Sequence, residues 1–97
     1  MTVVTSPAYE DFITRVESVL DALTGHLSGH YTEAAEGDMF VGEQVGALDY
    51  LLIGMTEEGY RPPDDVLSVI RSLIADFHEE DPDRQRFQGF YDKIVTF

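Results

Sequence analysis

Residues 42–73 decide the predicted fold, and they read GEQVGALDYLLIGMTEEGYRPPDDVLSVIRSL. Apolar residues at the start of this stretch recur with the spacing of one helical face: Val41, Val45, Leu48, Leu52 and Met55. Gly59 follows the last of them, and a glycine with positive φ commonly ends a helix. The pattern therefore predicts a helix that ends at Gly59.

A second helix is predicted after Pro62 and Pro63. Asp64 and Asp65 come next, where negative charge stabilises the N-terminal end of a helix. Its apolar face is formed by Val66, Leu67, Ile70, Leu73, Ile74 and Phe77. Because only about five residues connect the two helices, we expect them to form an antiparallel helical hairpin.

One helix is predicted on either side of this pair. Ser6 and Pro7 favour a helix start, and a wide apolar stripe follows: Tyr9, Phe12, Ile13, Val16, Val19, Leu20, Leu23 and Leu27. Asp81 and Pro82 provide the same kind of start for a last helix. Its apolar face contains Phe87, Phe90, Tyr91 and Ile94.

The segment between Gly29 and Gly37 has little apolar content, so we expect a connection that contains a short helix. Asp38 is the expected N-cap of the helix that passes through Gly42. The whole chain predicts an all-α fold, a compact antiparallel bundle of about four helices. We expect a single domain over residues 1–97, with a flexible tail at residues 1–5.

The charge of the chain restricts its function, because 19 acidic residues face six basic ones and the net charge is −13. Such a field repels nucleic acid and anionic membranes and speeds association with a basic protein, although acidity also serves solubility alone. We expect a basic protein partner, no direct nucleic-acid binding and no membrane association. Without cysteine, a secretory signal or an apolar run long enough for a bilayer, a cytoplasmic protein is expected, with a monomer favoured.

No pattern in the sequence indicates catalysis, a metal site or a cofactor. His26 and His30 are four residues apart, but Gly29 interrupts them and no third ligand is near. A calcium loop over residues 81–92 would need glycine where Arg86 stands and glutamate where Asp92 stands. We therefore expect a protein that is not an enzyme and uses no cofactor.

The central stretch resembles a known family. The residues that carry the likeness are Gly42–Glu43, Ala47–Leu48–Asp49, Leu51–Leu52, Glu57–Glu58–Gly59, Pro62–Pro63 and Val66–Leu67. This pattern is similar to small bacterial immunity proteins of polymorphic toxin systems, in particular the Maf-type, whose core reads G-E-x-x-x-A-L-x-x-L before a proline-led second helix. The resemblance covers about a third of the chain. It implies a small acidic helical protein that binds and blocks a cognate toxin, often a nuclease, and it transfers no interface residue.

A partner surface is predicted around Tyr50. Steps of seven residues place Glu43, Tyr50 and Glu57 on one face, opposite the apolar stripe. Gly46 and Gly54 flank Tyr50 and would leave its ring prominent, as in an interface anchor. The alternative is that these glycines let another helix pack there and that Tyr50 is partly buried.

Two acidic pairs, Glu57–Glu58 and Glu79–Glu80, fall at predicted helix C-termini, where the helix dipole disfavours anions. Either they are simply solvated, or something other than helix stability keeps them there. Antiparallel packing would gather acidic residues at two poles. One pole would hold Glu36, Asp38, Glu43, Asp76, Glu79, Glu80, Asp81 and Asp83, and the other would hold Glu57, Glu58, Tyr60, Asp64 and Asp65. The predicted toxin-binding residues are Glu36, Asp38, Glu43, Tyr50, Glu57, Glu58, Tyr60, Glu79 and Glu80.

The sequence thus predicts an immunity protein that neutralises a basic toxin by stoichiometric occlusion. Two alternatives stay open at this point. One is a nucleic-acid mimic that inhibits a DNA-binding protein, and the other is a regulatory adaptor or scaffold.

Overall fold

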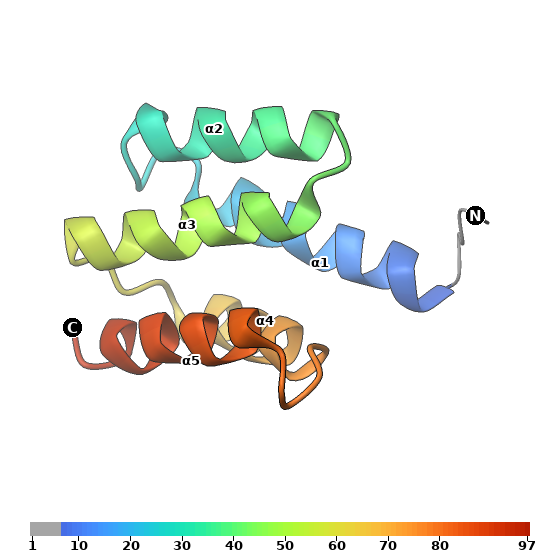
Figure 1. Ribbon diagram of the computed structural model, residues 1–97. Helices are drawn as coiled ribbons and strands as arrows, with labels where there is room; N and C mark the ends of the chain where they lie inside the picture. The colour runs from blue at the N-terminus through green and yellow to red at the C-terminus, as the bar shows by residue number, and fades with distance from the viewer. Residues whose placement is uncertain (1–6) are drawn as a thin grey trace.

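A computed structural model describes residues 7–97, with side chains from Tyr9 onward. It contains the helices α1 (Pro7–Leu23), α2 (Gly29–Phe40), α3 (Gln44–Glu58), α4 (Asp64–Ala75) and α5 (Pro82–Ile94) (Figure 1). No strand forms in this part of the chain, so the all-α prediction is confirmed. The described residues form five helices rather than about four. The expected tail at residues 1–5 and the expected cap at Ser6 lie outside the described residues.

The additional helix is α2, which replaces the expected connection. Its sequence lacks an aliphatic stripe because it packs through small and aromatic side chains: Thr32 and Ala35 are buried, and Tyr31 packs against the core. The expectation for Asp38 is wrong as well. Asp38 lies inside α2, and the N-cap position of α3 is Glu43.

Helix α3 is the centre of the molecule, since it packs against α1, α2 and α5. Leu48, Leu51, Leu52 and Met55 have no solvent exposure. A helix with several neighbours needs more than one apolar face, and the single stripe predicted from the sequence omitted Leu51. The prediction that Val41 and Val45 belong to the buried stripe is wrong, because their exposed fractions are 66% and 37%.

The predicted hairpin of α3 and α4 does not form. Both helices are described in full, and none of their Cα atoms approach within 8 Å of each other. Helix α3 ends at Gly59 with a φ of 64°, as predicted, but α4 packs against α1 and α5. Five residues span at most about 16–18 Å, whereas packed helices lie only about 8–10 Å apart. The connection at residues 59–63 is therefore long enough to carry the chain beyond the position next to α3, so α4 can pack elsewhere.

The antiparallel neighbours of the central region are α2 and α3, which run side by side in opposite directions (Figure 1). The predicted start of α5 is confirmed: the Asp81 carboxylate accepts a hydrogen bond from the Asp83 backbone N–H at 2.9 Å, and Pro82 is the first helical residue. Asp64 and Asp65 occupy the first turn of α4, as predicted. No helix of the described chain has the length and apolar character needed to cross a bilayer.

Candidate partner-binding surface

Among the described residues, most carboxylates have no cationic partner. Three arginines form ion pairs with five aspartates: Arg15 with Asp11 and Asp76, Arg61 with Asp64, and Arg86 with Asp49 and Asp83. All nineteen acidic residues lie between positions 10 and 92, so fourteen of them have no ion pair within the described residues. The negative field predicted from composition therefore persists on the folded surface.

Five of the predicted toxin-binding residues lie toward one end of the molecule. Figure 1 shows this end at the right, where the α2–α3 connection, the α4–α5 connection and the first turns of α1 are found. We call it the loop end and define it by residues 9–13, 36–45 and 76–81. Glu36 and Asp38 lie in its part of α2, Glu43 lies in the α2–α3 connection, and Glu79 and Glu80 belong to the α4–α5 connection.

Glu57 and Glu58 are the last residues of α3, and Tyr60 follows them in the α3–α4 connection. The Glu58 carboxylate accepts hydrogen bonds from the Ser28 backbone N–H at 3.0 and 3.3 Å. Ser28 is the N-cap of α2, so this carboxylate lies at the positive end of that helix dipole. The Tyr60 ring stacks on His26, with ring centroids 5.6 Å apart. Glu58 and Tyr60 thus have contacts within the fold, and the predicted set is divided between two ends.

The structure also changes the interpretation of Tyr50. A Cβ added at Gly54 would lie 2.8 Å from Cγ of Tyr31, and one at Gly46 would meet the Asp38 carboxylate. Both glycines therefore face α2 and leave no open floor beside Tyr50, whose exposed fraction is 39%. This is the alternative considered above, in which glycines admit a neighbouring helix.

The most exposed apolar residues were not predicted to lie on the partner surface. Phe40, the last residue of α2, is 92% exposed, and Val41 follows it. Gly42 has a φ of 81° and turns the chain directly after them, which removes both side chains from the apolar face of the next helix. The letters Phe-Val-Gly were a signal for this, because a glycine in the left-handed conformation ends helical periodicity.

Hollows lie on two sides of α1 at or beside the loop end. The first has a volume of about 220 Å³ and lies between α1, α3 and the end of α4. It is lined by Tyr9, Phe12, Val45, Asp76 and Phe77. The second, of about 350 Å³, lies between α1 and α2 and is lined by Ile13, Glu17, Leu20, Asp21, Glu36, Met39 and Phe40. The loop end thus combines exposed apolar side chains with carboxylates at their margin.

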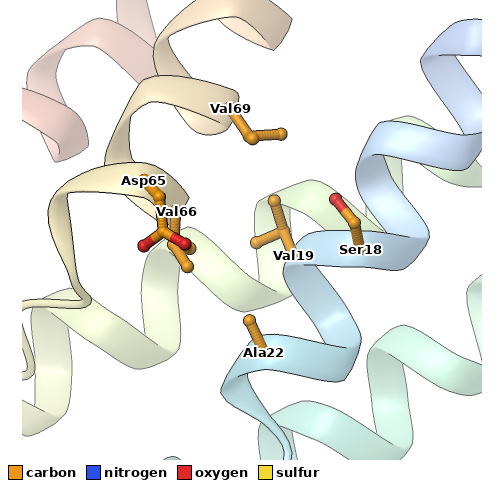
Figure 2. A pocket seen from close by; sticks show the side chains of 6 residues that line it. All are labelled: Ser18, Val19, Ala22, Asp65, Val66 and Val69. Atoms are coloured by element: carbon orange, nitrogen blue, oxygen red, sulfur yellow. The ribbon is translucent and has the colours of Figure 1, made fainter.

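A third hollow, of about 280 Å³, separates α1 from α4 (Figure 2). Val19 extends between the two helices, Val66 and Val69 line the α4 side, and Ser18 lies at the margin. A single carboxylate, that of Asp65, borders it. This hollow lacks both the exposed aromatic ring and the group of acids found at the loop end, which is therefore the stronger candidate.

Arg86 and His30 have contacts within the fold. Arg86 of α5 donates a hydrogen bond to the Asp49 carboxylate of α3 at 2.5 Å, and this bond raises the pKa of Arg86 above its ordinary value. His30 contacts the edge of the Tyr31 ring. Across the described side chains, no group of three or more His, Asp or Glu residues is arranged to hold a metal ion.

Comparisons of the chain with known protein families, with curated proteins and with solved structures find no significant match.

Proposed function

We propose that this protein is an immunity protein that binds a basic toxin domain, of nuclease type, in a stoichiometric complex and occludes its active site or a surface that it needs. The observation that carries the proposal is the loop end, where exposed Phe40 shares a hollow with Glu17, Asp21 and Glu36, and exposed Val41 follows it two residues before Glu43. The likeness of residues 42–67 to Maf-type immunity proteins supports the same function.

The composition of this surface agrees with the anatomy of protein interfaces. Binding energy is concentrated in a few buried aromatic anchors, and a polar rim around them governs specificity and association rate. Phe40 has the properties of such an anchor, since folding leaves its ring in water. Glu36 and Glu43 supply charge that steers a basic partner toward it.

The test uses a candidate toxin domain. This is the variable C-terminal domain of a large secreted protein whose gene neighbours the gene of this protein. We expect a 1:1 complex by size-exclusion chromatography with light scattering, loss of the toxin activity in the complex, and survival of cells that express both proteins. Absence of such a neighbouring gene, or a toxin domain that stays active and unbound in the presence of this protein, would contradict the proposal.

Charge reversal locates the surface. Glu43→Lys is expected to slow association about threefold, because it replaces a negative charge by a positive one at the loop end. Glu57→Lys is the matched control, since Glu57 is exposed at the opposite end of α3 and forms no ion pair in the described chain. Equal slowing by both variants would mean that the net charge, and not the loop end, governs binding.

A nucleic-acid mimic is the second candidate, favoured by the fourteen carboxylates without ion pairs. A mimic would compete with DNA for several unrelated basic DNA-binding proteins, in proportion to their charge. An immunity protein discriminates among them through its apolar contacts. Competition measured by fluorescence anisotropy against a panel of such proteins separates the two functions.

A further inference from the structure

The hollow between α1 and α2 has an apolar floor and acidic walls. Its apolar lining consists of Ile13 and Leu20 of α1 and Met39 and Phe40 of α2. Leu20 is buried, Ile13 and Met39 are half-buried, and the Phe40 ring is almost fully exposed at the margin. Glu17 stands on the α1 side and Glu36 on the α2 side. The volume of about 350 Å³ admits one long side chain.

No cation of the described chain neutralises these carboxylates. Glu17 and Asp21 are four residues apart on α1, a spacing at which like charges repel each other. Arg15 is the nearest cation along α1, but it pairs with Asp76 and donates to the Ser72 hydroxyl, both on α4. The groove therefore keeps three like charges around an apolar floor.

An arginine side chain satisfies all of these features at once. Its aliphatic stem covers apolar surface while its charged end reaches the rim. The planar guanidinium has five donors for carboxylates on two sides, and it stacks on aromatic rings. A second copy of this chain and a nucleic acid are both disfavoured as occupants, because each would bring more negative charge to Glu17, Asp21 and Glu36.

We propose that the groove between α1 and α2 binds one arginine side chain of the basic partner, with the guanidinium between Glu17 and Glu36 and against the Phe40 ring. The identification of this arginine as a residue of the toxin rests on the proposed function. The prediction that the groove binds an arginine side chain does not. Lysine fits less well, since its ammonium is a compact charge that cannot bridge two carboxylates with a planar fork.

The groove can be tested with the whole chain and Nα-acetyl-arginine N-methylamide as the probe. In low salt, titration followed by NMR is expected to give saturable shifts at the Ile13 and Met39 methyl groups and at Phe40, with a dissociation constant of the order of 10 mM for so small a ligand. The corresponding lysine amide should bind at least threefold more weakly.

Matched variants identify the contacts. Glu17→Gln/Glu36→Gln should weaken the probe at least fivefold and Phe40→Ala about threefold. The controls Glu57→Gln/Glu79→Gln, which removes the same two charges outside the groove, and Phe97→Ala should leave it unchanged. Shifts that do not saturate, equal affinity for the lysine amide, or equal weakening by Glu57→Gln/Glu79→Gln would overturn the proposal. A two-dimensional amide spectrum of each variant verifies its fold.

The same variants separate this inference from the proposed function. A toxin domain that binds the groove variants as tightly as the wild type, together with a probe that fails to saturate, overturns the groove and leaves the immunity function standing. Saturable binding of the arginine probe, together with a toxin domain that is not inhibited, would support arginine binding by the groove and contradict the immunity function.

Discussion

At Gly54, the missing side chain leaves the space that the Tyr31 ring fills. Three atoms of Tyr31, including its Cβ, lie within 3.0 Å of the position where a Cβ would be placed. These are not the far end of a flexible chain, so an added methyl group would push against a part of Tyr31 that the backbone holds. This contact explains why α3 keeps a glycine that helix propensity disfavours.

Gly54→Ala is therefore expected to lower the free energy of unfolding by about 1–3 kcal/mol, because overpacking outweighs the gain in helix propensity. Gly89→Ala is the matched control in α5, where nothing lies within 4 Å of the added Cβ. It should raise stability by roughly 0.5–1 kcal/mol. Urea unfolding measures both, and a stabilised Gly54→Ala would show that Tyr31 does not hold its place.

Phe40 illustrates the opposite case, an aromatic residue that the fold does not use. Phe40→Ala should change the unfolding free energy by less than about 0.5 kcal/mol, since the ring is already in water. Phe87→Ala, at a position without any solvent exposure, should lose about 3–5 kcal/mol. Thermal and urea unfolding compare the two variants. A loss of more than 1 kcal/mol at Phe40 would mean that its ring packs in solution.

At the scale of elements, α2 depends on its neighbours. It has few large apolar residues, and its first turn contains no acidic residue. The carboxylate of Glu58, from the end of α3, supplies the missing negative charge at the Ser28 N–H. An acid that opposes the dipole of its own helix thus stabilises another helix.

This arrangement predicts a difference between adjacent glutamates. Glu58→Ala should lose about 0.5–1 kcal/mol relative to Glu57→Ala, because both changes remove a charge from the end of α3 but only one removes the cap of α2. Urea unfolding gives the free energies, and amide hydrogen exchange should be faster in the first turn of α2 in the Glu58 variant. Identical stabilities and exchange rates would show that the hydrogen bonds at Ser28 contribute nothing.

At the scale of the whole molecule, charge repulsion opposes folding. Fourteen carboxylates without ion pairs share a surface of 5752 Å², and the net charge is −13. Salt screens such repulsion, since the Debye length falls from about 30 Å at 0.01 M to about 10 Å at 0.1 M. The surplus of acid that attracts a basic partner therefore lowers the stability of the free protein.

Raising NaCl from 10 to 300 mM is expected to increase stability by about 1 kcal/mol, which corresponds to a rise of roughly 4–8 °C in Tm for a domain of this size. Circular dichroism measures the transition. The variant Glu79→Gln/Glu80→Gln, with two fewer charges in the α4–α5 connection, should respond less. A Tm that stays constant or falls with salt would mean that the arginine ion pairs outweigh the repulsion.

The loop end shows how far a surface can be predicted from one sequence. Glu36, Asp38, Glu43, Glu79 and Glu80 were assigned to one pole from helix direction alone, and they lie toward one end of the molecule. Phe40 was not assigned, because an apolar residue near an expected helix start is ordinarily placed in the core. Whether a side chain is exposed depends on which other helix packs over it, and the spacing of apolar residues in the sequence does not give that information.

By itself, the sequence determined that the chain is helical and strongly acidic, and where several helices begin and end. Gly59 and the pair Asp81–Pro82 act through backbone conformation and hydrogen bonds within a few residues, so no distant contact was needed to predict them. Only the tertiary structure decided that residues 29–40 form a complete helix, that α3 pairs with α2 and not with α4, and that Glu58 caps α2. Those outcomes depend on which apolar faces cover one another, and that is a choice among distant segments that no local pattern specifies.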